Sequence, residues 1–302
     1  MKKLLALTLM LIIASTLFAA FNPAYSDYQF YNVHDYNTDK AYLEKSLNET
    51  SSDSEKAEIL WRLSRNILTL TDDIEKSSEN KQARLDGYTK AEDLAQQSVD
   101  LVESYNGYHW LASAIGRIGQ VNGPLNSLGK AKPMRALVEK VQNDFNADYT
   151  DSWYVLGILY NQLPGGPISF GDKDYAISYM RRCIDTQDNV NRNNLTNYLE
   201  LAQQLVDRDW NTSKRAKEFD KMQKKYNSNS VPTEKMKYYE GKDGKNGKPF
   251  YSTVTLDKIS DKQEAVMILR YALAFYEKTP VKFESDSTKI EEINKLLSEI
   301  TK

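Results

Sequence analysis

The chain has 302 residues, of which 40% are apolar, and its 40 Lys and Arg nearly balance its 42 Asp and Glu. This length is enough for one large domain or two ordinary ones, with a sizeable core. The charge balance argues against a nucleic-acid-binding protein, because phosphate contacts need a basic surface. A single cysteine excludes an internal disulfide framework and a cysteine-based zinc site, and two histidines leave few ways to build a catalytic triad. We therefore expect a non-enzymatic protein with no cofactor and no metal.

Residues 1–26 have the pattern of a secretory signal peptide. A basic start is followed by an apolar run from Leu4 to Ala20, and the small residues Ala24 and Ser26 stand where a signal peptidase reads the chain. We predict cleavage after Ser26, with cleavage after Ala20 as the alternative. An uncleaved membrane anchor is the competing interpretation, since the run approaches the length of a short transmembrane helix. No cysteine lies near the junction, so a lipid-anchored lipoprotein is excluded.

The cleaved chain is expected to be periplasmic or secreted. Loss of residues 1–26 removes two lysines and leaves 38 basic against 42 acidic residues, a net charge of −4. No second apolar run is long enough to span a bilayer, so we expect no stable membrane insertion after cleavage. Residues 27–53 are interpreted as an N-terminal extension before the first strongly periodic segment.

From Ser54 onward apolar residues recur at intervals of three and four, which predicts amphipathic helices. We expect eight such helices, at residues 59–70, 85–101, 108–118, 134–141, 153–163, 175–184, 194–206 and 213–226. Short helices in consecutive pairs favour an all-α repeat array over residues 54–226.

The third pair of helices carries the clearest motif. Trp153, Leu156, Gly157 and Tyr160 stand at the spacing of the first helix of a tetratricopeptide repeat. The glycine has a physical reason, because two helices of one repeat approach closely only where one side chain is small. The same tryptophan slot is filled by Trp61 and Trp110 in the earlier pairs and by Tyr198 in the last.

The pattern resembles a divergent branch of the tetratricopeptide family, with insertions of several residues between paired helices. That branch includes the T-component proteins associated with periplasmic TRAP transporters and, more distantly, the regulator-of-microtubule-dynamics proteins. The resemblance implies a binding protein that cooperates with a periplasmic solute-binding protein and holds a small organic acid or apolar ligand. Members of the T-component family are commonly lipid-anchored, and this chain departs from them there.

The composition changes after Tyr226. Residues 227–260 are interpreted as a linker or hairpin, because the β-prone stretches 237–240 and 250–256 flank a Gly-Lys-rich stretch at 241–248. That stretch lacks the spacing of a phosphate-binding loop and is interpreted as a solvated turn. Helices are expected at 261–278 and 288–301, where residues 261–302 would cap the open end of the array.

For the histidines, the cysteine and the acidic groups, a structural role is favoured over catalysis or metal binding. His109 and His34 have no second histidine or cysteine nearby in sequence, and Cys183 occupies a repeat position that normally takes alanine. The acidic groups Asp72-Asp73 and Asp207–Asp209 lie at helix ends and are interpreted as solvated. We therefore predict binding rather than catalysis.

The candidate binding surface is the face that the first helices of the repeats turn toward a concave groove. Its lining is apolar in the middle and polar at the ends, which suits a small ligand with an apolar body or an extended peptide. The alternative is that the C-terminal helices cover this face. The residues assigned to it are Arg62, Asn66, Thr69, Tyr108, Leu111, Ile115, Ile118, Asp151, Tyr154, Ile158, Asn161, Leu199, Gln203 and Val206.

Two further residues are candidates near the groove. Arg117 is interpreted either as a ligand-carboxylate contact or as a partner of an acidic residue inside the repeat. Phe170 either folds over the groove entrance or packs under its own loop. The leading functional hypothesis is an exported carrier of a small apolar or carboxylate ligand, working with a solute-binding protein. The alternative is an adaptor or scaffold that binds an envelope protein and no small molecule.

Overall fold

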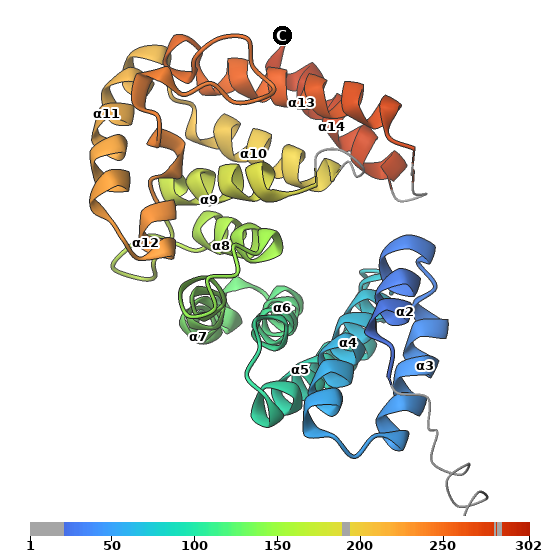
Figure 1. Ribbon diagram of the computed structural model, residues 1–302. Helices are drawn as coiled ribbons and strands as arrows, with labels where there is room; N and C mark the ends of the chain where they lie inside the picture. The colour runs from blue at the N-terminus through green and yellow to red at the C-terminus, as the bar shows by residue number, and fades with distance from the viewer. Residues whose placement is uncertain (1–20, 189–193, 281, 283–285) are drawn as a thin grey trace, which may run out of the picture. The chain divides into compact units, whose positions relative to one another are not determined.

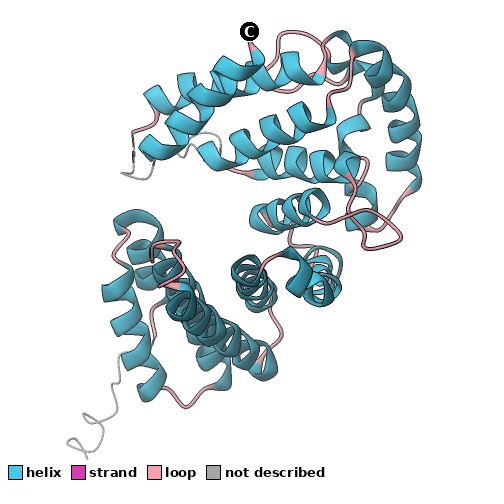
Figure 2. Cartoon of the chain, turned by 180° about the vertical axis from the view of Figure 1, so that it is seen from behind, coloured by secondary structure: helices cyan, strands magenta, loops and turns pink. Residues whose placement is uncertain are grey.

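The computed structural model describes residues 21–188, 194–280, 282 and 286–302, so the apolar run predicted as a signal peptide lies outside the described residues. Throughout the described part the chain forms helices, turns and loops without a strand (Figure 2). No helix there is long and apolar enough to cross a bilayer. The chain divides into two compact units, with the boundary after Lys130. The fold class is all-α, as predicted.

Unit 1 begins with helices where the sequence predicted an N-terminal extension. Helix α3 packs against α4, α4 against α5, and α5 against α6. Side chains fix the starts of two of these helices, because Ser52 and Ser104 each accept a hydrogen bond from the backbone N–H three residues later. The elements are α2 (Pro23–Tyr28), the π-helical turn η1 (Gln29–Val33), α3 (Tyr36–Glu49), α4 (Asp53–Asp72), α5 (Lys81–Leu101) and α6 (Tyr105–Asn122) (Figure 1).

Unit 2 contains the remaining helices, and α7 (Pro124–Asn143) runs across the boundary between the units. Its elements are α8 (Thr150–Gln162), α9 (Lys173–Thr186), α10 (Leu195–Arg208), α11 (Thr212–Ser228), α12 (Pro232–Met236), the 3-10 turns η2 (Tyr239–Gly241), η3 (Gly244–Asn246) and η4 (Leu256–Lys258), α13 (Asp261–Lys278) and α14 (Asp286–Ile300). Each helix predicted from apolar periodicity is therefore present.

The pair α8 and α9 packs as the repeat motif predicts. A Cβ atom on Gly157 would lie only 2.6 Å from Met180 Sδ, so the glycine is required for the close approach of the two helices. Trp153 is buried and its ring stacks on that of Tyr179, with 5.9 Å between centroids. In unit 1, a Cβ on Gly87 would likewise lie 2.2 Å from Thr71 Oγ1 between α5 and α4.

The predicted pairing of the seventh and eighth helices is wrong. Helix α10 packs against α9, α13 and α14, whereas α11 packs against α12 and the 3-10 turns. The reason is the amount of apolar surface. Helix α11 buries only Phe219 and Met222 as apolar side chains, while α13 supplies a full stripe to the core shared with α10. The buried α13 residues in that core are Ala265, Ile268, Leu269 and Ala272.

The β-hairpin expected within residues 227–260 does not form. Residues 237–260 instead form turns and loops that include the three 3-10 turns, and these turns pack on α11. Gly241 allows this contact, because a Cβ there would lie 2.3 Å from Met222 Cβ, and Gly244 has a φ of +55° that favours glycine. The Gly-Lys stretch is thus only partly a solvated turn, since Lys245 and Lys248 are exposed while the glycines are buried.

Candidate functional site

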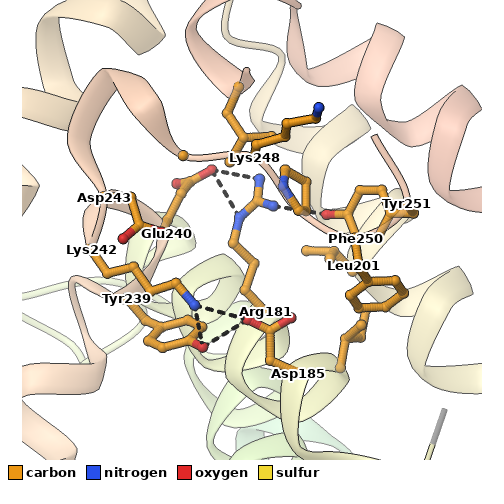
Figure 3. Close-up of a pocket in the computed structure, with 14 residues that line it drawn as sticks. Arg181, Asp185, Leu201, Tyr239, Glu240, Lys242, Asp243, Lys248, Phe250 and Tyr251 are labelled. Carbon is orange, nitrogen blue, oxygen red and sulfur yellow. Dashed lines mark hydrogen bonds and ion pairs between the residues drawn. The ribbon is translucent and has the colours of Figure 1, made fainter. Parts of the chain in front are cut away.

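A pocket of about 250 Å³ lies within unit 2, between α9, α10 and the segment from η2 to η4 (Figure 3). Ile184, Leu201 and Leu256 give it apolar walls, and Phe250 and Tyr251 add aromatic rings. Its polar lining comes mainly from α9 and from the Gly-Lys stretch that the sequence analysis set aside.

The floor of the pocket is the guanidinium of Arg181, in the middle of α9. Its Nε and Nη2 donate to Glu240 Oε1 over 3.3 and 2.9 Å. Its Nη1 and Nη2 donate to the two carboxylate oxygens of Glu264 over 2.6 and 2.7 Å. Nη1 also donates to the Tyr251 hydroxyl over 3.0 Å. Because a guanidinium has five N–H donors, Arg181 has none left for a ligand.

Beneath this floor two further arginines extend the ion network. Arg208 donates to both oxygens of Glu240 over 2.6 and 2.8 Å, and to both oxygens of Asp261 over 2.8 and 2.9 Å. Arg215 pairs with Glu264 and lies 3.4 Å from Asp261, measured from Nε to Oδ1. Three arginines thus face three carboxylates, and each of the six side chains is at most 7% exposed.

The network holds Glu240 and Glu264 ionised. Burial alone would raise the pKa of Glu240, but the charges of Arg208 and Arg181 lower it to about 2. For Glu264, the charges of Arg181 and Arg215 likewise outweigh burial and hold the pKa far below its usual value. Asp174 lies at the edge of the network, 3.5 Å from Arg208. Burial dominates there and raises the pKa of Asp174 to about 6.

The rim of the pocket carries two lysines with different surroundings. Lys242 Nζ donates to Asp185 Oδ2 over 3.2 Å and to the Tyr239 hydroxyl over 2.7 Å, and that hydroxyl donates to the same Asp185 oxygen over 2.7 Å. Lys248 is exposed and makes no ion pair within the described part of the chain. Phe250 stands beside it with 47% of its surface exposed.

This arrangement is suited to binding rather than to proton transfer. The acid–base groups of the floor are committed to ion pairs that keep each of them in one protonation state. Cys183 is fully buried, and burial raises the pKa of its thiol well above the usual value. The lining that an incoming molecule meets consists of apolar and aromatic side chains, the Lys242–Asp185–Tyr239 cluster and Lys248.

The predicted groove residues of unit 1 are largely enclosed. Arg62 and Asn66 are buried and contact acidic side chains from α2 and α3. Tyr108, Leu111 and Ile115 of α6 are also buried.

Arg117 pairs with Asp72, the last residue of α4. Its Nη2 donates to Asp72 Oδ2 over 2.9 Å. The pairing interpretation of Arg117 is therefore confirmed, and Asp72 is not a solvated helix end.

The predicted groove residues of unit 2 are scattered. Tyr154 packs against the core around α10, and Ile158 and Asn161 are half-buried on α8. Gln203 is exposed and donates to Asp207 over 3.0 Å. Phe170 packs edge-on against Tyr160, with ring centroids 5.1 Å apart, which agrees with packing under its own loop. None of the sixteen residues predicted for the groove and its surroundings lines the pocket.

The two histidines have structural surroundings. His109 is buried and meets the Trp110 ring edge-on, with centroids 5.1 Å apart. His34 adopts a left-handed backbone conformation after η1, and its Nδ1 lies 2.9 Å from the Tyr36 hydroxyl. Both arrangements agree with the structural interpretation of these residues.

The sequence analysis missed the residues of the ion network, although a signal for them exists. Each arginine continues an apolar helical stripe at intervals of four and three. The stripes are Ile177–Arg181–Ile184 on α9, Leu201–Leu205–Arg208 on α10 and Arg215–Phe219–Met222 on α11. A charge on a buried stripe needs a partner. Asp207 and Asp209 are exposed at the end of α10, whereas Arg208 between them turns into the network.

The described helices form an all-α, tetratricopeptide-like array, in which α8 and α9 approach closely at Gly157 beside the buried Trp153. Comparison with protein families finds a match to the regulator of microtubule dynamics protein 1-3 family over residues 28–162, which is less than half of the chain. The chain is also similar to the crystal structure of a thermophilic TPR protein of Thermus thermophilus. That likeness has 16% sequence identity and a TM-score of 0.46, and covers 73% of this chain and 97% of that one. No curated protein matches the chain.

Proposed function

We propose that this chain is an exported, non-catalytic binding protein that holds a small organic ligand in the unit 2 pocket. Its partner would be a periplasmic solute-binding protein, as the resemblance to the T-component family implies. The observation that carries the proposal is a difference in charge pairing. The charged groups of the pocket floor neutralise one another, whereas the ammonium of Lys248 at the rim makes no ion pair within the described part of the chain.

The chemistry of the lining selects the class of ligand. A compact molecule with an apolar or aromatic body would pack against Leu201 and Phe250, because burial supplies affinity in such sites. A carboxylate on that body would be oriented by Lys248. The floor repels neither sign of charge strongly, because its arginines and carboxylates balance.

The test is native mass spectrometry of protein purified from its own cell envelope. The wild-type chain is expected to retain a small molecule that both Lys248→Ala and Phe250→Ala lose, with the melting temperature unchanged. Lys245→Ala is the matched control, since Lys245 is an exposed lysine of the same stretch that pairs with Asp220 instead of lining the pocket. Wild-type protein without any bound compound would contradict the carrier function.

A second candidate function is an adaptor that binds an envelope protein. Helical repeats of this type are commonly protein-binding scaffolds. The observation that favours it here lies in unit 1, where Arg62 and Arg65 of α4 donate hydrogen bonds to the carboxylate of Asp27 in the short helix α2. Crosslinking in the source cell should then recover one defined envelope protein, and recovery of none would count against the adaptor.

The structure also bears on the proposed signal cleavage. Asn22 caps α2, and its backbone N–H donates to the Tyr42 hydroxyl over 2.7 Å. Ser26 is fully buried. Cleavage after Ser26 would remove these contacts, whereas cleavage after Ala20 leaves α2 whole, so the packing supports the second site. N-terminal sequencing of exported protein decides between them: a chain starting at Phe21 is expected, and one starting at Asp27 would contradict this proposal.

A further inference from the structure

One face of α4 binds the carboxylate of Asp27 from the preceding helix α2. Arg62 donates to it twice, from Nε over 3.1 Å and from Nη2 over 2.9 Å. Arg65 donates from Nη1 over 2.9 Å. Three charge-assisted hydrogen bonds therefore converge on one carboxylate. Arg62 belongs to the residues that the repeat register assigns to the groove, as does Asn66 one turn later.

The same face holds an aromatic ring three residues after the carboxylate. Phe30 is buried, and its ring centroid lies 3.9 Å from the Arg65 guanidinium carbon. The Arg62 guanidinium carbon stands 3.9 Å from the Trp61 ring centroid. Arg62 and Arg65, which both pack on aromatic rings, thus contact an acidic and an aromatic side chain that are three residues apart in the sequence.

The segment that supplies these two groups leaves much of its apolar surface exposed. Helix α2 has six residues and buries only Ser26. The large side chains Tyr25, Tyr28 and Val33 are 39%, 56% and 47% exposed. A helix docked permanently on a core normally turns its apolar side chains inward. This segment turns several of them outward. Besides Asp27 and Phe30, it is held by the buried Ser26 and by contacts of Asn22 and Tyr25 with Tyr42.

Each arginine has a second acidic partner that would hold it if the segment left, because Glu58 pairs with Arg62 and Asp39 with Arg65. Asp39 of α3 is fully buried, accepts a hydrogen bond from Asn66 over 2.7 Å and lies 3.5 Å from Arg65. Without Asp27, Nε and Nη2 of Arg62 and Nη1 of Arg65 would lose their acceptor. A carboxylate would restore charge-assisted hydrogen bonds that are stronger than those to water, so the vacated face would favour another acidic ligand.

We propose that this face of α4 is a docking site for a helical segment of a partner protein. That segment carries an acidic residue followed three positions later by an aromatic one. In the free protein, residues 22–33 occupy the site as an internal ligand that the partner displaces. The proposal rests on the adaptor function for the existence of a partner, and it does not depend on the pocket of unit 2.

The test uses a fluorescent peptide copy of residues 22–33 as the probe and the full chain as the receptor. In wild type the internal segment competes, so the peptide is expected to bind weakly. Asp27→Asn weakens the competitor and should tighten binding about tenfold in fluorescence anisotropy. A peptide with the change equivalent to Asp27→Asn, and one equivalent to Phe30→Ala, should bind neither receptor.

Controls separate the outcomes. Arg117→Gln alters a guanidinium of the same unit that pairs with Asp72 instead of Asp27, and it should leave peptide affinity unchanged. Near-ultraviolet circular dichroism checks that Asp27→Asn remains folded, and Asp27→Glu, which keeps the charge, should retain the weak wild-type binding. Equal binding of acidic and neutral peptides would overturn the proposal. So would dimers of Asp27→Asn in analytical ultracentrifugation, because the occupant would then be a second copy of this chain.

Crosslinking distinguishes failure of this site from failure of the adaptor function. If the Asp27→Asn chain captures more of an envelope protein than wild type does, both the docking site and the adaptor function are supported. An envelope protein captured equally by the two chains would support the adaptor and overturn the docking site. Peptide binding without any envelope partner in the cell would leave the site standing as a peptide-binding face and contradict the adaptor.

Discussion

Both units place buried arginines on helical faces, but they supply the matching carboxylates differently. In unit 1 Asp27 comes from a six-residue helix, and its side chain is 36% exposed. In unit 2 Glu240 and Glu264 come from η2 and from α13, and neither side chain is exposed. Similar ion pairs therefore differ in how far their carboxylates are exposed to water.

The difference separates a permanent contact from a replaceable one. In unit 2, removal of one carboxylate would leave a buried arginine charge without its counter-ion. In unit 1, water already reaches Asp27 and could replace its bonds at a lower cost. The unit 2 network is thus suited to fixing the shape of a pocket, and the unit 1 contact to exchange with a partner.

The largest expected effect comes from Glu264→Gln. This carboxylate accepts hydrogen bonds from Arg181, Arg215 and Tyr251. Its neutralisation should lower the free energy of unfolding of unit 2 by about 3–5 kcal/mol, the usual cost of breaking a buried ion pair from one side. Urea unfolding followed by circular dichroism measures it. Glu292→Gln, which alters an exposed pair with Lys289, should cost less than about 1 kcal/mol.

A loss for Glu264→Gln no larger than that for Glu292→Gln would show that the network is not a permanent contact. The comparison between the units would then lose its basis.

Acid should weaken unit 2 through Glu240. Its pKa is about 2 in the folded chain against an ordinary 4.5, so its contribution is present above pH 4.5 and is lost as pH falls toward 2. The difference corresponds to about 3 kcal/mol. Urea unfolding between pH 5 and pH 2 measures the slope. A Glu240→Gln chain should be less stable at pH 5 and should lack this part of the decline; an unchanged slope would contradict the assignment.

In unit 1, Asp27→Asn should have a smaller effect. The pKa of Asp27 is lowered because hydrogen bonds from Arg62 and Arg65 outweigh partial burial. Since the side chain is 36% exposed, we expect a loss of only about 1 kcal/mol. Hydrogen exchange should accelerate within residues 22–33 while α13 stays protected. Equal acceleration in both places would mean that Asp27 supports the whole fold and not a replaceable segment.

The sequence predicts the helices but not the site, for a physical reason. Apolar periodicity is local, so α4 to α11, α13 and α14 can be recognised from neighbouring residues, whereas α2, α3 and α12 fall in segments predicted as an extension or a linker. The partners of Arg181 lie 59 and 83 residues away in the chain, and no spacing rule connects them. The position of Arg181 on an apolar stripe predicts that a partner exists, while only the fold identifies Glu240 and Glu264.

The two pairing errors have a similar origin. Helix α10 takes α13 as its partner because α11 has too few apolar residues to cover it. The segment after Met236 packs on α11 through its 3-10 turns, because glycines in it allow close approach to that helix. Periodicity finds amphipathic elements, but the choice between possible partners depends on the apolar surface each one offers.

The smallest expected effect distinguishes the edge of the unit 2 network from its centre. Burial raises the pKa of Asp174 to about 6 from an ordinary 3.8. Its folded form therefore binds the proton more strongly, and its contribution to stability, complete below pH 3.8, is lost as pH rises through 6. Asp174→Asn removes this loss. The side chain is 36% exposed, so we expect a gain of at most about 1 kcal/mol at pH 7.5 and none at pH 4. Urea unfolding at the two pH values measures it. If the variant is less stable than wild type at pH 7.5, Arg208 needs the charge of Asp174. The buried network of unit 2 would then reach the surface, and it would differ less from the partly exposed contact of unit 1.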